Sequence, residues 1–385
     1  MAAAGFSLRL VAKRTRMLAG NRADFKEKSA LFAVRCARNS VNDDAMDDSL
    51  KRETEKLIKS WMQYDEAILR DYLVEDVEDP RINVQSILTR HFLIDALFGD
   101  RFAALMEHEL RFGMVMNWLL KLAKSAVGTE DFQAIHHALR QGADNAEGLL
   151  IPQFVLQTFA ALPAKVGKTV VPNYLDGLLS DAVSASEKPA LEARNLAAFE
   201  VLWQEALQKE QRQGISVLEA ACGSANDYRF IHAYGLGGWL NYAGFDLCEK
   251  NIRNARVLFP KVGFAVGNVM AIASPDKTFD YCFAQDLLEH LSVEAMELAV
   301  AELCRVTRQG LCLGFFNMHE GEDHVVRPVD DYHWNTLSMA RTRDLFEQLG
   351  FAGQMVHIDT FLKWRFGCEE THNKNAYTFV LSAQC

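Results

Sequence analysis

The first half of the chain places apolar residues at the spacing of one helix face. Residues 84–98, VQSILTRHFLIDALF, carry them at 84, 87, 88, 92, 94, 97 and 98, and residues 47–73 follow the same period. A short helix is expected over 130–142, where Gly142 ends it. Prolines recur in residues 163–189, which reads as a linker. We therefore expect an all-α N-terminal domain over residues 1–189.

Beyond residue 190 the pattern changes to alternation. After a lead-in helix at 190–211, short apolar runs alternate with helical patterns, most clearly at 247–258 and 292–307. The runs predict strands at 216–221, 242–246, 262–267, 279–285 and 311–316. A helix at 341–349 precedes two further runs, 354–361 and 376–382, which predict a terminal hairpin. Strands that alternate with helices form a mostly parallel sheet, so residues 190–385 are expected to form an α/β domain.

Composition narrows the choice of partner and compartment. The chain has 385 residues and a formal net charge of −10, which argues against a nucleic-acid backbone as its main partner. Its eight cysteines are scattered without a CxxC pair, as is typical of reduced thiols, so we expect a cytoplasmic protein. No run reaches the roughly 18 uninterrupted apolar residues of a membrane span.

Residues 1–23 differ from the rest because they are basic and contain no acid. Such a segment can lie on an anionic membrane or direct a chain to an organelle. A first helix with a solvated basic face is the plainer interpretation, and we favour it. Peripheral membrane contact through residues 1–23 stays open as the alternative.

Residues 217–226, VLEAACGSAN, place small residues directly after the first predicted strand. Ligands of parallel α/β sheets bind at the carboxyl ends of the strands, where a glycine-rich turn lets them approach the backbone. Asp246 ends the second predicted strand, 27 residues after Glu219, and an acid there can accept hydrogen bonds from ribose hydroxyls. Tyr228 stands where the dinucleotide pattern GxGxxG needs its third glycine. We therefore predict a nucleoside site for a ligand without a pyrophosphate.

Five segments, taken in order, resemble the class I S-adenosylmethionine-dependent methyltransferases with small-molecule substrates. They are VLEAACGSA (217–225), GFDLCEKNIRNAR (244–256), GNVMAIASPDKTFDYCFAQDLLEHL (267–291), VTRQGLCLGFF (306–316) and DYHWNTLSMARTRDLFEQLGF (331–351). The resemblance covers about residues 190–385 and implies a Rossmann-like sheet with S-adenosylmethionine as cofactor. Ala221 and Ala225 replace two glycines of the first motif, and Asn268 replaces a common aspartate.

Carried over residue by residue, the resemblance also implies a cofactor site. One group would shape the methionine pocket, an acid would bind the ribose hydroxyls, a third group would meet the adenine, and a fourth would line the floor beneath the sulfonium. In that order the residues are Glu219, Ala221 and Gly223; Asp246; Asn268 and Val269; Gln285 and Asp286.

Transfer to a hydroxyl acceptor also needs a base, most often a histidine, whereas the activated methyl comes from the cofactor. The loop 317–335 holds His319 and His324, which we predict as candidates for the general base. Two alternatives are a divalent metal bound by the acids and histidines of this loop, and a solvated loop without chemistry. His333 and Trp334 are predicted to pack the loop over the substrate.

The acidic balance and the large helical domain favour a small or medium-sized acceptor. It could be a natural product, a glycan or a lipid-linked intermediate, methylated on a hydroxyl, an amine or a carbon. The helical domain could cap the substrate, dock a partner or form a homodimer. A non-catalytic scaffold that keeps the fold is the alternative, and the substitutions Ala225 and Asn268 are its support. His290, at a helix start, is expected to be structural.

Overall fold

The computed structural model describes residues 48–61, 83–103, 214–233, 236–369, 371 and 373–384. It also describes single positions between 107 and 121 and residues 173, 174, 197, 198 and 201. Apart from those positions, the predictions for residues 1–23, 130–142, 163–189 and 190–211 lie outside the described residues. The division of the chain at residues 189 and 190 therefore stays a prediction.

Seven strands form one sheet in the order β10-β11-β5-β4-β1-β2-β3. β2 is parallel to both β1 and β3, whereas β11 is antiparallel to both β5 and β10. The order reverses between β1 and β4, which is where α/β sheets bind their ligands. The strands are β1 (Ile215–Ala220), β2 (Leu240–Asp246), β3 (Gly263–Val266), β4 (Phe279–Gln285), β5 (Thr307–Phe315), β10 (Phe351–His357) and β11 (Tyr377–Ala383). The predicted mostly parallel sheet with an antiparallel end is confirmed.

The predicted helices between these strands are also present. They are α11 (Asn226–Ala233), α12 (Glu249–Leu258), α13 (Val293–Val306) and α14 (Met339–Gln348), with a 3-10 turn, η5 (Leu288–His290), after β4. In the N-terminal part, α3 (Asp48–Trp61) and α5 (Val84–Phe98) agree with the helical periods. The remainder of the predicted helix 47–73 lies outside the described residues.

The chain divides into two compact units. The first contains residues 1–63, 213–282 and 297–309, and the second contains residues 64–212, 283–296 and 310–385. In the first unit, β1 and β2 are almost wholly buried, and Glu219 lies opposite Gly244 in their register. A Cβ at Gly244 would lie 2.9 Å from the Phe264 ring and 3.1 Å from Cys222, so only glycine allows this close packing.

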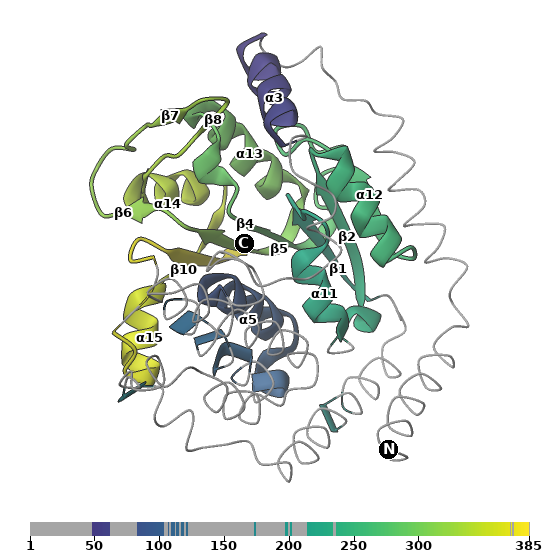
Figure 1. The fold of residues 1–385 in the computed structure, drawn as a ribbon. Helices are drawn as coiled ribbons and strands as arrows, with labels where there is room; N and C mark the ends of the chain where they lie inside the picture. The colour runs from purple at the N-terminus through teal and green to yellow at the C-terminus, as the bar shows by residue number, and fades with distance from the viewer. Residues whose placement is uncertain are drawn as a thin grey trace, which may run out of the picture. The chain divides into compact units, whose positions relative to one another are not determined.

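In the second unit, α5 lies next to β11 and makes hydrogen bonds to both β5 and β11 (Figure 1). The Gln85 amide donates to the Phe315 carbonyl at 2.5 Å, and the hydroxyls of Thr89 and Thr378 are 2.8 Å apart. Arg90, fully buried in the middle of α5, forms an ion pair with Glu109 at 2.5 Å. This helix lies early in the sequence, but it is part of the packing around the sheet.

The predicted hairpin at the C-terminus is confirmed, with one correction. β10 ends at His357, and the expected strand 354–361 gives way to the helix α15 (Ile358–Phe366). Its apolar residues recur at 358, 361, 362 and 366, which is a helical spacing, and Gly367 ends it in the left-handed conformation with φ 66°. Among the described residues, no helix is long and apolar enough to cross a bilayer.

Candidate functional site

The turn after β1 winds through the left-handed region three times. Ala221, Gly223 and Ala225 have φ values of 57°, 52° and 67°, and α11 begins at the next residue. Glycine adopts this conformation freely, whereas an L-alanine there is strained. The two alanines that replace glycines of the motif therefore have the backbone conformation that glycine adopts most readily.

Asp246 closes this turn from the end of β2. Its carboxylate is 1% exposed and accepts the backbone N–H of Gly223 at 2.9 Å, that of Cys248 at 2.8 Å and the Asn251 amide at 3.3 Å. Burial raises the pKa of Asp246, although these hydrogen bonds oppose the shift. A carboxylate has about four acceptor positions, so one is left for a further donor. The structure thus brings together Gly223 and Asp246, as predicted from their places in the sequence.

Glu219 is buried within β1, where the hydroxyl of Tyr242 on β2 donates to it. Burial, and then the charge of Glu219, raises the pKa of Tyr242 well above its ordinary value, so this hydroxyl stays a donor. The acid is therefore held in one orientation between the two strands. Its predicted role beside the methionine moiety stays a prediction.

The end of β3 lies beside the end of β2. The backbone N–H of Gly267 donates to the Asp246 carbonyl at 3.0 Å, which brings the next two residues to this edge. The Asn268 side chain accepts the N–H of Met270 at 2.9 Å, and both Asn268 and Val269 are buried. The structure therefore groups three of the predicted contacts, for methionine, ribose and adenine, around the ends of β1, β2 and β3.

In the second unit, the predicted site residue Asp286 at the end of β4 forms a charged pair with His290 that the sequence analysis did not predict. Asp286 has a φ of 49°, and its carboxylate lies 2.9 Å from Nε2 of His290. The other ring nitrogen of His290 lies 3.1 Å from the carbonyl oxygen of His333. Burial lowers the pKa of His290, but the hydrogen bond and charge of Asp286 outweigh it and raise the pKa to about 9. With an acceptor at each nitrogen, the ring is an imidazolium at neutral pH. The spacing of four residues between an acid and a histidine was the available signal.

Glu289, also missed, lies between this pair and the end of β5. It is 2% exposed, and its Oε1 accepts the N–H of Phe316 at 2.5 Å. Its Oε2 has no hydrogen-bond partner among the described residues. Burial, followed by the charge of Asp286, raises the pKa of Glu289 to about 7. An acid that titrates near neutral pH therefore lies at the carboxyl ends of β4 and β5.

His319 and His324 both have one ring nitrogen committed to the backbone. Nδ1 of His319 accepts the N–H of Gly321 at 3.0 Å, and Nδ1 of His324 accepts the N–H of Ser338 at 2.9 Å. A neutral ring bound in this way carries its proton on Nε2 and is a donor there. Burial, and then the charge of Arg341, lowers the pKa of His324, so its neutral form is favoured. Either histidine must release its backbone partner before it can accept a proton.

The loop that carries His333 and Trp334 is fixed over the Glu289 segment. Asn335 donates its N–H to the Glu289 carbonyl at 3.0 Å and its side-chain amide to the Leu291 carbonyl at 2.7 Å. The Trp334 ring is tilted by 57° against the His290 ring, and their centroids are 5.1 Å apart. Contact of His333 and Trp334 with a substrate stays a prediction. Within the described residues, no three histidine, cysteine or acidic side chains form a group that could hold a metal ion.

Comparison with known proteins gives one match to a family and one to a curated relative. A family model described as "Methyltransferase domain" matches residues 217–310. A "Probable S-adenosylmethionine-dependent methyltransferase" of Mycolicibacterium smegmatis is 29% identical over 146 residues, which are 36% of this chain and 52% of the relative. The chain thus spans about half the length of the curated relative that it matches.

Two solved structures with a similar arrangement are methyltransferases, but the likeness is low. A Burkholderia thailandensis 1,6-didemethyltoxoflavin-N1-methyltransferase is 13% identical, with a TM-score of 0.36 over 56% of this chain and 92% of its own. An S-adenosylmethionine-dependent methyltransferase from Mesorhizobium loti is 16% identical, with a TM-score of 0.36 over 48% and 97%. Because both TM-scores are low, the assignment to a family rests on the family match and on the order of the sheet. Residues 217–310 are a methyltransferase domain of the class I, S-adenosylmethionine-dependent type.

Proposed function

We propose that this protein transfers a methyl group from S-adenosylmethionine to a small or medium-sized acceptor. The observation that carries the proposal is the contact between the turn after β1 and the end of β2. There Asp246 accepts the N–H of Gly223 and keeps one acceptor position for a further donor. A nucleoside that lies against this turn would present its ribose hydroxyls to that carboxylate.

The turn after β1 and the ends of β2 and β3 fit S-adenosylmethionine, which is a nucleoside cofactor that has no pyrophosphate. Three left-handed residues keep the turn compact, and Gly223 carries no side chain that would keep a ligand away from the backbone. Asn268 and Val269 lie beside the end of β2, and in this proposal they meet the adenine. The bound cofactor supplies a methyl group already activated on a sulfonium. The chain has to bind the acceptor in line with that methyl and to exclude water.

A hydroxyl acceptor must also lose a proton. His319 and His324 remain the proposed bases, but each presents Nε2–H in the described arrangement and would orient an acceptor oxygen as a donor. We add Glu289 as a third candidate, because its pKa of about 7 leaves part of the population ionised at neutral pH. Natural products, glycans and lipid-linked intermediates all offer hydroxyl groups, and this is why they remain the proposed acceptor classes.

The scaffold alternative has one observation in its favour. Ala225 is fully buried with a φ of 67°, so its methyl group occupies space beside the turn that a glycine would leave open. If that methyl prevents the cofactor from approaching, the fold persists without transfer activity. The two functions therefore differ first in whether the protein binds S-adenosylmethionine.

Isothermal titration with S-adenosylmethionine and S-adenosylhomocysteine tests the proposal. The wild type is expected to bind with a Kd of about 1–100 μM, and Asp246→Ala to lose at least about tenfold in affinity. Asp280→Ala is a matched control, because Asp280 also accepts a backbone N–H, that of Ser216 at 2.9 Å, in the same unit. The control should bind like the wild type. A folded wild type that binds neither compound would contradict the proposal and favour the scaffold.

A further inference from the structure

The β7–β8 hairpin, residues 328–333, is held to the rest of the second unit at few points. β7 (Pro328–Val329) pairs with β8 (Tyr332–His333), and no residue of the hairpin is buried. Among the described residues, the hairpin makes one hydrogen bond to another element, between the carbonyl of His333 and the ring of His290 at 3.1 Å. A segment with few buried contacts belongs to the part of a structure that opens most easily.

His290 forms a bridge between this hairpin and Asp286. Its Nε2 lies 2.9 Å from Oδ1 of Asp286, and its Nδ1 faces the His333 carbonyl. The Tyr332 and Trp334 rings both lie against the imidazole, with their centroids 5.8 and 5.1 Å from its own. The groups that face His290 come from the segment after β4 and from the loop, and they are Asp286, Glu289, Tyr332, His333 and Trp334. His290 therefore joins the hairpin to the end of β4.

Only a charged ring can donate at both ends of this bridge. The Asp286 carboxylate and the His333 carbonyl are both acceptors, whereas a neutral imidazole has one N–H and one lone pair. The hydrogen bond to the carboxylate is the stronger of the two, so a neutral ring keeps its proton on Nε2. Its Nδ1 lone pair then faces the lone pairs of the His333 carbonyl, and this contact becomes repulsive. Asp286 and the hairpin thus compete for the last ring proton.

The pH at which the ring loses its charge follows from the groups around it. Burial lowers the pKa of His290, but the hydrogen bond and charge of Asp286, then the charge of Glu289 and the bond to His333, raise it to about 9. The pKa in the folded protein thus lies above the ordinary value of 6.5. The bond to the hairpin is therefore complete below about pH 6.5 and is lost as the pH rises through about 9.

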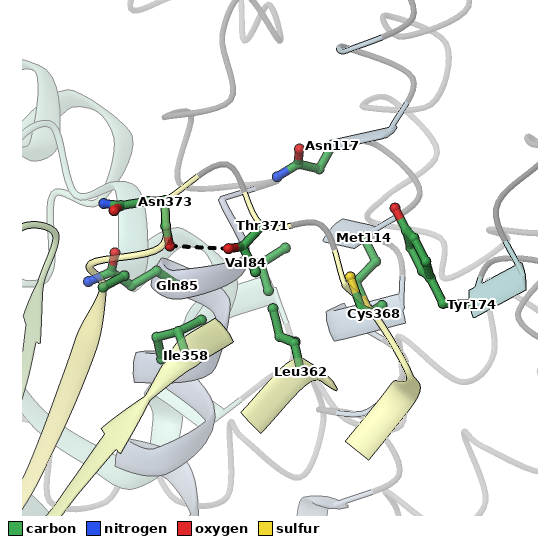
Figure 2. Close-up of a pocket in the computed structure, with 11 residues that line it drawn as sticks. Val84, Gln85, Met114, Asn117, Tyr174, Ile358, Leu362, Cys368, Thr371 and Asn373 are labelled. Carbon is green, nitrogen blue, oxygen red and sulfur yellow. Dashed lines mark hydrogen bonds between the residues drawn. The ribbon is translucent and has the colours of Figure 1, made fainter. Parts of the chain in front are cut away.

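Glu289, the neighbour of His290, is held independently of the hairpin. The N–H of Phe316 donates to the Glu289 carboxylate, and the carbonyl of Phe316 accepts the Asn373 amide. The carbonyl of Asn373 in turn accepts the Thr371 hydroxyl at 3.3 Å, a bond that Figure 2 marks. Release of the hairpin therefore leaves these contacts of Glu289 in place.

We propose that His290 is a positioning residue whose charged ring latches the β7–β8 hairpin to Asp286, and that loss of one ring proton releases the hairpin. The released hairpin stays attached at Asn335, which donates to the carbonyls of Glu289 and Leu291. Because His333 and Trp334 move with the hairpin, the latch decides whether these two predicted substrate contacts are in place. Only that last step rests on the proposed function, since the latch itself needs neither cofactor nor acceptor.

Trp334 reports the position of the hairpin, because its ring is 38% exposed while it lies against His290. The full chain is labelled with 5-fluorotryptophan, and Trp334→Phe identifies the resonance of this ring among those of the six tryptophans. The measured quantity is the shift of that fluorine resonance between H2O and D2O, which grows with the exposure of the ring to solvent. In the wild type this isotope shift should rise toward its value in the urea-unfolded chain, with a midpoint near pH 9.

Asp286→Asn separates competition for the proton from a general loosening in alkali. Asparagine adopts the φ of 49° found at this position, and its amide can donate to Nε2 of His290. A neutral ring can then keep its proton on Nδ1 and donate to the His333 carbonyl. The isotope shift of this variant should therefore stay at the low value up to about pH 10.5, although its His290 loses the charge at a lower pH than in the wild type.

Two further variants complete the test. Asp323→Asn is the control, because it removes an acid of the same loop that pairs with Arg341 at 3.3 Å, and it should keep the wild-type midpoint. His290→Leu has no ring proton to donate and should show the released value already at neutral pH. Circular dichroism at each pH confirms that the chain is folded. If the wild type unfolds below pH 9, His290→Leu at neutral pH still decides.

Three results would overturn the proposal: a constant isotope shift in a folded wild type up to about pH 10.5, release of Asp286→Asn at the wild-type midpoint, or the low value for a folded His290→Leu at neutral pH. Because S-adenosylmethionine is absent, these outcomes are independent of whether the chain binds the cofactor. Release of the hairpin near pH 9 in a chain that does not bind the cofactor would leave the latch standing and the proposed transfer refuted.

Discussion

Glu109→Gln is expected to destabilise the protein by about 3–5 kcal/mol, because it removes one partner of a buried ion pair. Arg90 is 0% exposed and Glu109 is 4% exposed, with 2.5 Å between their charged atoms. Burial raises the pKa of Glu109, but the charge of Arg90 and the neighbouring His91, whose Nε2 lies 3.6 Å from Oε2 of Glu109, outweigh it and lower the pKa. Replacing the carboxylate by an amide of the same shape leaves a buried guanidinium without its counter-charge. The loss is measured by urea unfolding followed by circular dichroism at pH 7.

Glu107→Gln is the matched control, two residues away. Glu107 pairs with Arg111 at 2.9 Å and Arg365 at 3.4 Å, but it is about one-third exposed, and pairs of this kind contribute about 0–1 kcal/mol. Because the folded pKa of Glu109 is depressed, its contribution is present above the unfolded value of about 4.5 and is lost as the pH falls through the folded pKa. The gap between wild type and Glu109→Gln should therefore narrow in acid. Equal stability of the two glutamine variants at pH 7 would refute the buried pair.

Three further predictions concern the site. The pKa of Glu289 is raised to about 7 in the folded protein. Its contribution to the free energy of unfolding is therefore fully present below about pH 4.5 and is lost as the pH rises through 7. Glu289→Gln should abolish this fall, which is about 2.5 kcal/mol in the free energy of unfolding between pH 5 and 8. Urea unfolding of the variant that shows the same pH dependence as the wild type would contradict the prediction. Ala221→Gly should stabilise by about 0.5–1 kcal/mol, because φ is 57° there, and a lower Tm in calorimetry would count against strain. Asn335→Ala should cost about 2–3 kcal/mol, because its buried amide binds the Leu291 carbonyl, and a loss below 0.5 kcal/mol would show that the loop is held elsewhere.

The spacing of apolar residues predicted the helices and strands well wherever a segment follows a single period. Each of the five apolar runs from 216 to 316 is a strand of the sheet. Such strands can be recognised because they are short apolar runs that are bounded by turn residues. The run at 354–361 was misread, since a strand that passes directly into α15 shows two periods in one apolar stretch. The packing of α5 on β5 and β11 could not be predicted, because Gln85 finds its partner 230 residues away.

The candidate site also contains residues that the sequence predicted and residues that it did not. Gly223 and Asp246 were found from sequence, because both follow strands whose ends meet at one edge of a parallel sheet. Glu289 and the charge on His290 were missed, because burial and the nearby Asp286 set their pKa values. The two side chains are also held by the Phe316 N–H and the His333 carbonyl, which reach η5 from residues 27 and 43 positions further along. Sequence spacing carries no information on such contacts.

A crystal structure with bound S-adenosylhomocysteine tests the central claim most directly. The account predicts the nucleoside against the turn 221–225, with a ribose hydroxyl within about 2.5–3.0 Å of the Asp246 carboxylate and the adenine beside Asn268 and Val269. A ligand that lies away from this turn, with Asp246 still bound only by protein donors, would contradict it.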